Sequence, residues 1–161
     1  MTIIRKFFFA TLLVSLMSSC SVSQAHVLDG AKEWNGHYYK AFEFQLNWEQ
    51  AKNFCESMGG HLATAENFNE NSVIQEIINA SGKDEYFLGG HRDNKEMWRW
   101  LTGGIITDQN WANGYPSYSP LMTMKKRANA KWTTSYSWGE NGKYPFICEW
   151  ESASAAHESN M

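Results

Sequence analysis

The sequence predicts a single α+β domain, because it combines segments with two different hydrophobic periodicities. Apolar residues recur at the three- and four-residue spacing of an amphipathic helix within 48–58 and 73–78. Aromatic and aliphatic residues are arranged as in short, half-buried strands within 37–44, 97–101 and 144–150. With 161 residues, of which 43% are hydrophobic and 15% aromatic, the chain can fill one core well.

The first predicted helix begins near Trp48. Asn47 is a suitable N-cap, and Gln50, three residues further on, can complete a capping box. Gly59-Gly60 then provides a residue that can adopt a positive φ and end the helix. The apolar residues fall on one face, so Cys55 points into the core with Trp48, Ala51, Phe54 and Met58.

A second helix is expected after Thr64 and ends at Ser81-Gly82. Three asparagines are candidate N-caps for it, namely Asn67, Asn69 and Asn71. Its apolar face consists of Val73, Ile74, Ile77 and Ile78.

Strands are expected at 86–90, where two glycines allow a neighbouring backbone to approach closely, and at 97–101. The last strands, 131–136 and 144–150, read as a hairpin joined by a turn at 139–142. Between 103 and 130 neither periodicity is present. Loops this long are usually functional or disordered, and the aromatic residues of this one argue against disorder.

Several short motifs, taken in order, resemble the C-type lectin-like domain family. They cover about 36–151 and comprise Trp48 with Ala51 and Cys55, Gly59-Gly60-His61-Leu62-Ala63, Phe87-Leu88-Gly89-Gly90, Trp98-Arg99-Trp100 with Gly103, Trp132, and Phe146-Ile147-Cys148-Glu149. The resemblance implies two helices flanking two small antiparallel sheets, with a long irregular loop that carries the ligand site.

The first residues predict an export signal, since Arg5-Lys6 precedes an apolar run, 7–17, that is too short to span a bilayer. Ser23-Gln24-Ala25 suits an ordinary signal peptidase, which makes 1–25 the leader and the protein secreted or periplasmic. Met17-Ser18-Ser19-Cys20 instead resembles a bacterial lipobox, which makes 1–19 the leader. Cys20 would then be lipidated, and the protein would be a membrane-anchored lipoprotein.

Either leader accounts for Cys20 and leaves two cysteines, Cys55 and Cys148. In an oxidising compartment this even remainder predicts a disulfide. Closing a loop of roughly 90 residues should contribute on the order of 4 kcal/mol to stability. The expected organisation is a linker at 26–35, the domain at 36–151 and a disordered tail at 152–161.

Charge and motif content exclude several classes of function. Removing Arg5 and Lys6 from the 14 basic residues leaves 12 against 17 acidic residues, a net charge of −5. This balance predicts no affinity for nucleic acid, and none for membranes except through a lipid on Cys20. No catalytic or phosphate-binding motif is present, so we expect neither an enzyme nor a cofactor. The histidines are scattered along the chain, at His26, His37, His61, His91 and His157.

Sugar-binding members of the family hold calcium with Glu or Gln, Pro, then Asn or Asp in the long loop, and with Trp-Asn-Asp in the next strand. The matching places here are Tyr115-Pro116-Ser117 and Trp132-Thr133-Thr134, which keep the proline and the tryptophan but lack the oxygen ligands. Calcium needs 6 to 8 oxygen ligands, including carboxylates. Between Gly103 and Gly139 the only carboxylate is Asp108, so the sequence predicts that this calcium site is absent.

Recognition without metal would rely on aromatic faces and on hydrogen-bonding groups at their rim. The candidate ligand-binding residues in the loop are Asn113, Tyr115, Ser117 and Tyr118. Trp111 and Trp132 resemble residues that the family buries, so we expect them to anchor the loop. The cluster Lys125-Lys126-Arg127 is either a solvated loop tip or a site for an anionic ligand such as an acidic glycan.

Two functions are consistent with these observations. The first is an exported, calcium-independent carbohydrate-binding module that recognises a glycan or cell-surface glycoconjugate. The second is a protein-recognition or adhesin module that keeps the lectin-like fold without binding sugar.

Overall fold

The computed structural model describes residues 26–107, 110–136 and 142–157. The predicted leader, Cys20, Asp108 and the end of the predicted tail lie outside them. The strands are β1 Lys32–Trp34, β2 His37–Leu46, β3 His61–Leu62, β4 Glu85–Arg92, β5 Trp98–Trp100, β6 Leu121–Lys125, β7 Lys131–Ser135 and β8 Tyr144–Trp150. The helices are α2 Trp48–Ser57 and α3 Phe68–Ala80, with the 3-10 turns η1 Lys126–Ala128 and η3 Ala153–Ala155.

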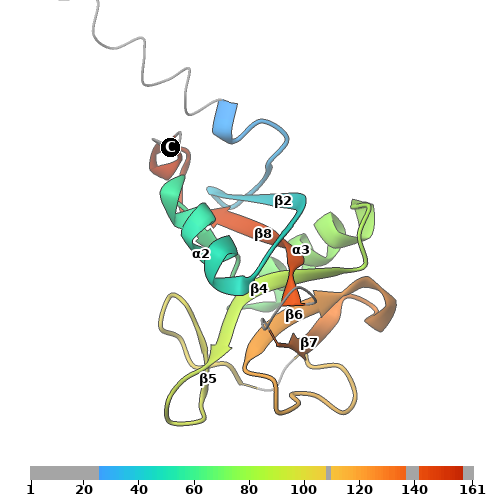
Figure 1. The fold of residues 1–161 in the computed structure, drawn as a ribbon. Helices are drawn as coiled ribbons and strands as arrows, with labels where there is room; N and C mark the ends of the chain where they lie inside the picture. The colour runs from blue at the N-terminus through green and yellow to red at the C-terminus, as the bar shows by residue number, and fades with distance from the viewer. Residues whose placement is uncertain (1–25, 108–109, 137–141, 158–161) are drawn as a thin grey trace, which may run out of the picture.

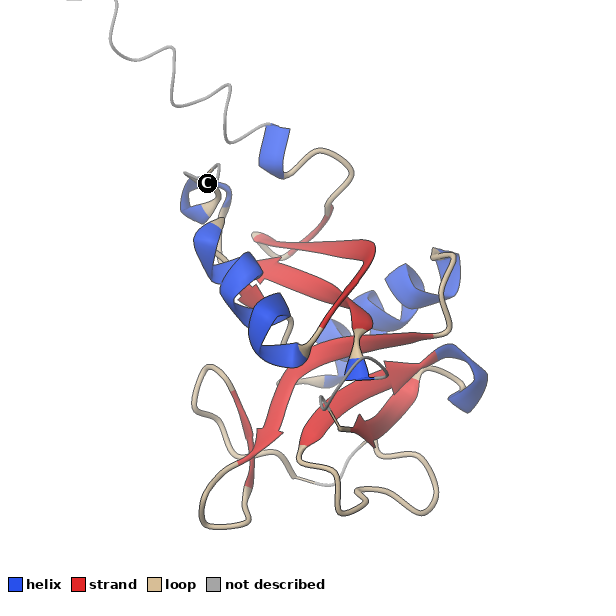
Figure 2. Ribbon diagram, in the orientation of Figure 1, coloured by secondary structure: helices blue, strands red, loops and turns tan. Residues whose placement is uncertain are grey.

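The strands form one mixed sheet in the order β1-β2-β8-β4-β6-β7, with β3 paired to β8 and β5 paired to β4 (Figure 2). Two small antiparallel sheets were expected, but their strands belong to two antiparallel parts of this one mixed sheet. They are joined by the parallel pairing of β4 with β8 at Phe87 and Phe146, the only parallel pairing among the named strands of the described residues. Both of these side chains are fully buried, so the junction lies inside the core.

The helices α2 and α3 cover opposite faces of the sheet (Figure 1). Side chains alternate between the faces along a strand. In β4 and β8, Phe87, Phe146 and Cys148 pack with α2, and Tyr86, Leu88 and Ile147 pack with α3. The α+β prediction is therefore confirmed, with two helical layers and one sheet between them.

The boundaries of both helices agree with the predicted caps. The N-cap of α2 is Asn47, which forms a capping box with Gln50. Gly59, at φ 78°, follows the last turn, and its amide donates to the carbonyl of Glu56 at 3.0 Å. The N-cap of α3 is Asn67, whose side chain accepts from the amides of Asn69 and Glu70.

The predicted hairpin of 131–136 with 144–150 is wrong. β7 pairs with β6, and β8 pairs with β2, β3 and β4. Strand β6 lies inside the segment expected to be irregular. Its three central residues, Met122, Thr123 and Met124, are all fully buried, and the short Met-Thr-Met-Lys alternation at 122–125 was the available local signal that the sequence prediction missed.

A disulfide links Cys55 of α2 to Cys148 of β8, with 5.5 Å between the Cα atoms. Both ends of the described chain contribute structure beyond the predicted domain bounds. Within the expected linker, β1 pairs with β2. Within the expected tail, the amide of His157 donates to the carbonyl of Met58 at 3.0 Å, and Ala156 is fully buried.

No helix in the described part of the chain is long and apolar enough to cross a membrane.

Candidate functional site

The long loop between β5 and β6 is held on the sheet by four tryptophans. Ring centroids are 4.9 Å apart for Trp98 and Trp111, 5.7 Å for Trp111 and Trp132, and 5.4 Å for Trp100 and Trp132. The amide of Trp132 donates to the carbonyl of Asn110 at 2.9 Å, and that of Ala112 donates to the carbonyl of Trp132 at 2.8 Å. Trp111 and Trp132 thus anchor the loop, as predicted.

Asn71 is a structural residue that the sequence reasoning considered only as a cap. It is 6% exposed, and its Oδ1 accepts from Trp132 Nε1 at 3.0 Å and from Asn110 Nδ2 at 2.9 Å. One buried side-chain oxygen therefore joins α3 to the loop and to β7. The sequence did contain a signal of burial, because Asn71 is the fourth residue of the helix and Ile74 and Ile78 follow it at helical spacing.

An open hollow of about 700 Å³ lies between the long loop and the hairpin of β6 and β7. Four of the predicted ligand-binding residues line it, namely Asn113, Tyr115, Lys125 and Arg127. The other polar and aromatic residues of its wall are Trp111, Asn129, Lys131 and Thr133. Lys131 is exposed and makes no ion pair with a described residue.

Three predicted residues lie outside this hollow: Ser117, Tyr118 and Lys126. Ser117 is held in the loop, since its hydroxyl contacts that of Thr134 and its carbonyl accepts from the Arg92 guanidinium. The Tyr118 ring is 89% exposed. The loop therefore presents two separate tyrosines, Tyr115 at the hollow and Tyr118 in solvent.

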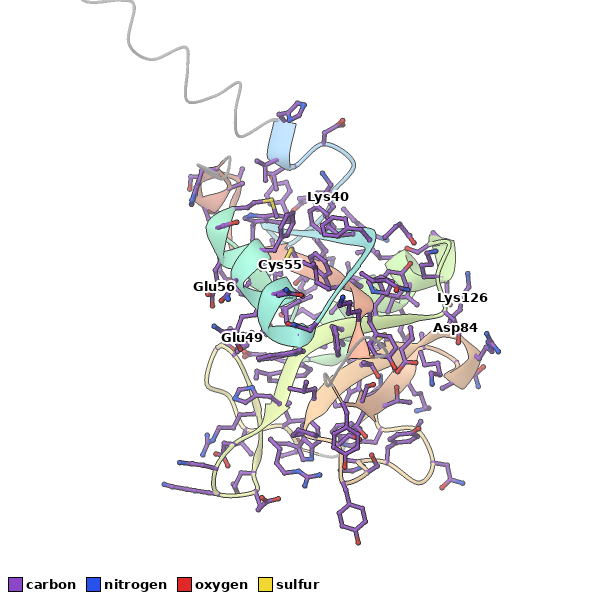
Figure 3. All side chains as sticks on the ribbon, viewed as in Figure 1. Lys40, Glu49, Cys55, Glu56, Asp84 and Lys126 are labelled. Carbon is purple, nitrogen blue, oxygen red and sulfur yellow. A yellow bond between two sulfur atoms is a disulfide. The ribbon has the colours of Figure 1, made fainter. Side chains whose placement is uncertain are left out.

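The basic cluster is paired with groups that precede and begin β4. Lys125 Nζ lies 3.0 Å from Glu85 Oε2, its partner in the strand register, and Arg127 Nε lies 3.0 Å from Asp84 Oδ2. Lys126 Nζ donates to the carbonyl of Ser81 at 3.1 Å, and the Lys126 amide donates to the carbonyl of Asp84 at 2.7 Å. Figure 3 shows Asp84 and Lys126 next to each other at this edge.

These contacts reduce the support for an anion site at Lys125-Lys126-Arg127. The pKa of Lys125 is raised: burial lowers it most strongly, but the hydrogen bond and charge of Glu85, with Tyr115 and Tyr144, outweigh burial. Lys125 therefore remains a cation, and its charge is matched by Glu85. The sequence reasoning could not anticipate this, because the pairing depends on how β4 and β6 are aligned.

The residues at the family's calcium position do not fit calcium. Ser117 and Thr134 contact each other through their hydroxyls. Thr133 is 2% exposed, and its hydroxyl lies 2.8 Å from that of Thr123, which donates to Glu85 Oε1 at 2.7 Å. Among the described residues, Glu85 is the one carboxylate that contacts these threonine hydroxyls, and it forms an ion pair with Lys125. This donor set lacks the carboxylates that calcium requires, so the prediction of calcium independence keeps its support but stays a prediction.

The fold and this loop define the class of protein. Residues 44–150 match the family model described as the lectin C-type domain, and the chain belongs to this family. The family is non-enzymatic, in agreement with the absence of catalytic motifs.

Among relatives, the chain is 30% identical over 145 residues to one subunit of a snaclec coagulation factor IX/factor X-binding protein from Trimeresurus stejnegeri. The match covers 85% of this chain and 93% of that protein. Among solved structures, it is similar to SPL-1 in complex with GlcNAc, with a TM-score of 0.70, 28% identity, and coverage of 80% of this chain and 97% of that chain. It is also similar to the Ca²⁺-independent C-type lectin SPL-2 of Saxidomus purpuratus, with a TM-score of 0.68, 28% identity, and coverage of 76% and 91%.

Proposed function

We propose that this protein is a carbohydrate-binding module that recognises glycan without calcium, through the hollow between the long loop and the hairpin of β6 and β7. The observation that carries the proposal is the composition of that hollow. Two aromatic residues, Trp111 and Tyr115, line the hollow together with Asn113, which carries an amide, and Lys131, which carries an ammonium group.

The chemistry of these groups suits a sugar. An aromatic face can cover the apolar face of a pyranose ring, while an amide and a cation hydrogen-bond its hydroxyl or acetamido groups. Tyr115 is half-buried and Asn113 is exposed, so a ring is held in place while a polar group stays accessible. No metal is needed for either contact.

Two of the similar structures support the proposal. One was solved with GlcNAc, and the other is described as a Ca²⁺-independent lectin. We therefore include an N-acetylhexosamine among the first sugars to be tested.

Export is part of the proposal. The leader motif and the Cys55–Cys148 disulfide both favour an oxidising, extracytoplasmic location. Lipidation at a lipobox requires a bacterial source. The snaclec relative comes from a snake and gives no support to such a source. We therefore favour cleavage after Ala25 over lipidation of Cys20.

Protein recognition is the second candidate, and a different observation favours it. Two large apolar side chains project into solvent, Tyr118 at 89% exposure and Phe68 at 81%. Exposed aromatic residues are typical anchors in protein interfaces. The relatives named as coagulation factor-binding proteins make this a specific alternative.

A glycan array probed with and without a chelator separates the two candidates, using two matched tyrosine variants. Sugar binding through the hollow predicts glycan binding that persists in chelator, is lost in Tyr115→Ala and is kept in Tyr118→Ala. Protein recognition predicts no glycan signal and a partner whose binding is lost in Tyr118→Ala. Glycan binding that survives Tyr115→Ala would exclude the hollow as the site.

A further inference from the structure

A second cavity lies between the first turn of α3 and the start of the long loop. Its volume is about 300 Å³, at the lower end of the range for small-molecule sites. Of the described residues that line the hollow, only Lys131 also lines this cavity. The cavity is therefore a candidate site separate from the one proposed for glycan.

Asn71 offers unused hydrogen-bond donors to this cavity, which it lines. An indole Nε1–H group can only donate, so the Asn71 atom that contacts Trp132 Nε1 must be the oxygen Oδ1. Oδ1 also accepts from Asn110 Nδ2, and these two bonds fix the orientation of the Asn71 amide. The Asn71 Nδ2 then hydrogen-bonds to no described residue, although the side chain is 94% buried (6% exposed). A buried amide donor needs an acceptor, which a ligand in the cavity would supply.

Two further donor groups lie at the same cavity. Asn67 lines it, and its Oδ1 is occupied as the helix cap by the amides of Asn69 and Glu70, so its Nδ2 is the group left to bind a ligand. Lys131 is exposed, and its ammonium group makes no ion pair with a described residue. Amide donors beside an unpaired cation favour a carboxylate, whose two oxygens accept several charge-assisted hydrogen bonds.

Glu66 is the one carboxylate among the described lining residues, and it does not cancel this preference. It is exposed, and its Oε1 accepts from the Thr102 hydroxyl. Solvent screens an exposed charge, whereas a hydrogen bond to the buried Asn71 amide is strengthened by its low-dielectric surroundings. We therefore expect an anionic group of a ligand at Asn71 and Lys131 rather than at Glu66.

The rest of the cavity wall is largely apolar. Trp100 and Trp132 are 3% and 4% exposed and form its inner part, with Ile106. Phe68 and Ile105 also line it and are 81% and 54% exposed. Covering these two side chains with an apolar group would remove their surface from water, which is favourable.

We propose that this cavity binds a small carboxylic acid with an apolar body, of the arylalkyl or short alkyl type. Its carboxylate accepts hydrogen bonds from Asn71 Nδ2 and Lys131 Nζ, and its apolar body lies against Trp100 and Phe68. The small volume favours such an acid over an oligosaccharide. This inference does not depend on glycan binding.

The test is calorimetric titration of the disulfide-bonded protein with 3-phenylpropionate, with tryptophan fluorescence in parallel because Trp100 and Trp132 line the cavity. We expect saturable binding of one 3-phenylpropionate per chain. The uncharged 3-phenylpropionamide should bind at least about 10-fold more weakly, since hydrogen bonds to an ionised acceptor are the stronger ones. The cation 3-phenylpropylamine has the same body, and binding of this amine as tight as that of the acid would overturn the proposal in favour of recognition by Glu66.

Asn71→Asp is the matched variant for the buried donor. It keeps an oxygen that accepts from Trp132 and Asn110 and replaces Nδ2 with a second oxygen, which repels a carboxylate. We expect it to weaken binding of 3-phenylpropionate at least about 10-fold, because a charge-assisted hydrogen bond is replaced by repulsion. Thermal unfolding of the variant shows whether the domain remains folded.

Lys131→Gln keeps the test interpretable if Asn71→Asp does not fold, because Lys131 is exposed. It should weaken binding of the acid but not of the amide. Lys95→Gln, which removes an exposed lysine outside the cavity, should bind the acid as the unchanged protein does. Absence of saturable binding of the acid would overturn the proposal, and so would unchanged affinity in both Asn71→Asp and Lys131→Gln.

The two proposed sites fail separately. Tyr115 lines the hollow and not this cavity. Tyr115→Ala should therefore bind 3-phenylpropionate normally whether or not the protein binds glycan. Loss of acid binding in Tyr115→Ala would contradict the placement of the acid at Asn71.

Discussion

At the scale of single residues, the loop depends on a few buried polar atoms whose partners come from distant parts of the chain. Asn71 Oδ1 accepts two side-chain hydrogen bonds, one from Asn110, which is 39 positions away in the sequence, and one from Trp132, which is 61 positions away. The sequence identified the tryptophans of this cluster by the family resemblance. It could not identify the acceptor for Trp132 Nε1, because an asparagine in the first turn of a helix looks like a cap.

Replacing Asn71 with alanine should lower the free energy of unfolding by about 1–3 kcal/mol, because the buried Trp132 Nε1 would lose its acceptor. Urea unfolding monitored by tryptophan fluorescence measures this change. The matched control is Asn69→Ala, an exposed position in the same helical turn, which should change stability by less than about 0.5 kcal/mol. Equal effects of the two substitutions would contradict the role given to Asn71.

Asp93 provides a pH-dependent prediction. Its pKa is lowered from 3.8 to about 2, chiefly by the hydrogen bond from Arg99 and then by that from the Met97 amide. Since the folded-state pKa is depressed, the stabilisation is complete above the unfolded value and disappears as pH falls through about 2. The difference in stability between the unchanged protein and Asp93→Asn should therefore be constant from pH 7 to about pH 4 and shrink below it. A difference that stays constant down to pH 2 would contradict the assignment.

At the scale of elements, local signals were predictable and non-local pairings were not. The start and end of α2 follow from Asn47, Gln50 and Gly59, which act within one helical turn. The alignment of Glu85 with Lys125 depends on which strands become neighbours, and no local pattern encodes it. The pairing of β7 with β6 was missed for the same reason.

Gly89 in β4 is a case in which the sequence alone predicted a tertiary contact. A Cβ on Gly89 would lie 2.5 Å from the carbonyl oxygen of Leu62, and the Gly89 amide donates to the carbonyl of Ala63 at 2.8 Å. The expectation that a backbone approaches closely here is confirmed. Gly89→Ala should cost about 1–3 kcal/mol, because neither backbone can move away without breaking this pairing.

Thermal or urea unfolding tests this prediction against Gly82→Ala. A Cβ on Gly82 would meet only the Glu43 side chain at 3.7 Å, an ordinary contact, so this control should be nearly neutral. A Gly89→Ala protein as stable as the Gly82→Ala protein would show that β3 and β4 are not packed as described.

At the scale of the whole molecule, the disulfide joins α2 to the last strand, β8, across 93 positions. It lies on the α2 face of the sheet, and the hollow lies at the long loop. Cys55→Ala with Cys148→Ala should therefore lower stability by about 2–4 kcal/mol through the loss of chain constraint, without changing ligand affinity in the protein that remains folded. Urea unfolding and a binding titration at low temperature measure the two effects separately.

Function is predictable from this sequence only to the level of the family and the candidate loop. The fold, the disulfide and the anchoring tryptophans follow from motifs in order along the chain. The sequence motifs do not show which loop residues line the hollow and which face solvent. Tyr115 and Tyr118 are only three residues apart, yet Tyr115 lines the hollow and Tyr118 is exposed.

The proposed recognition of glycan at the long loop uses no calcium. Titration of the protein with a glycan that binds on the array, first in excess chelator and then in millimolar calcium, tests this. Metal-free recognition predicts the same affinity in both solutions and a loss of affinity in Tyr115→Ala. Affinity that appears only with calcium would contradict it.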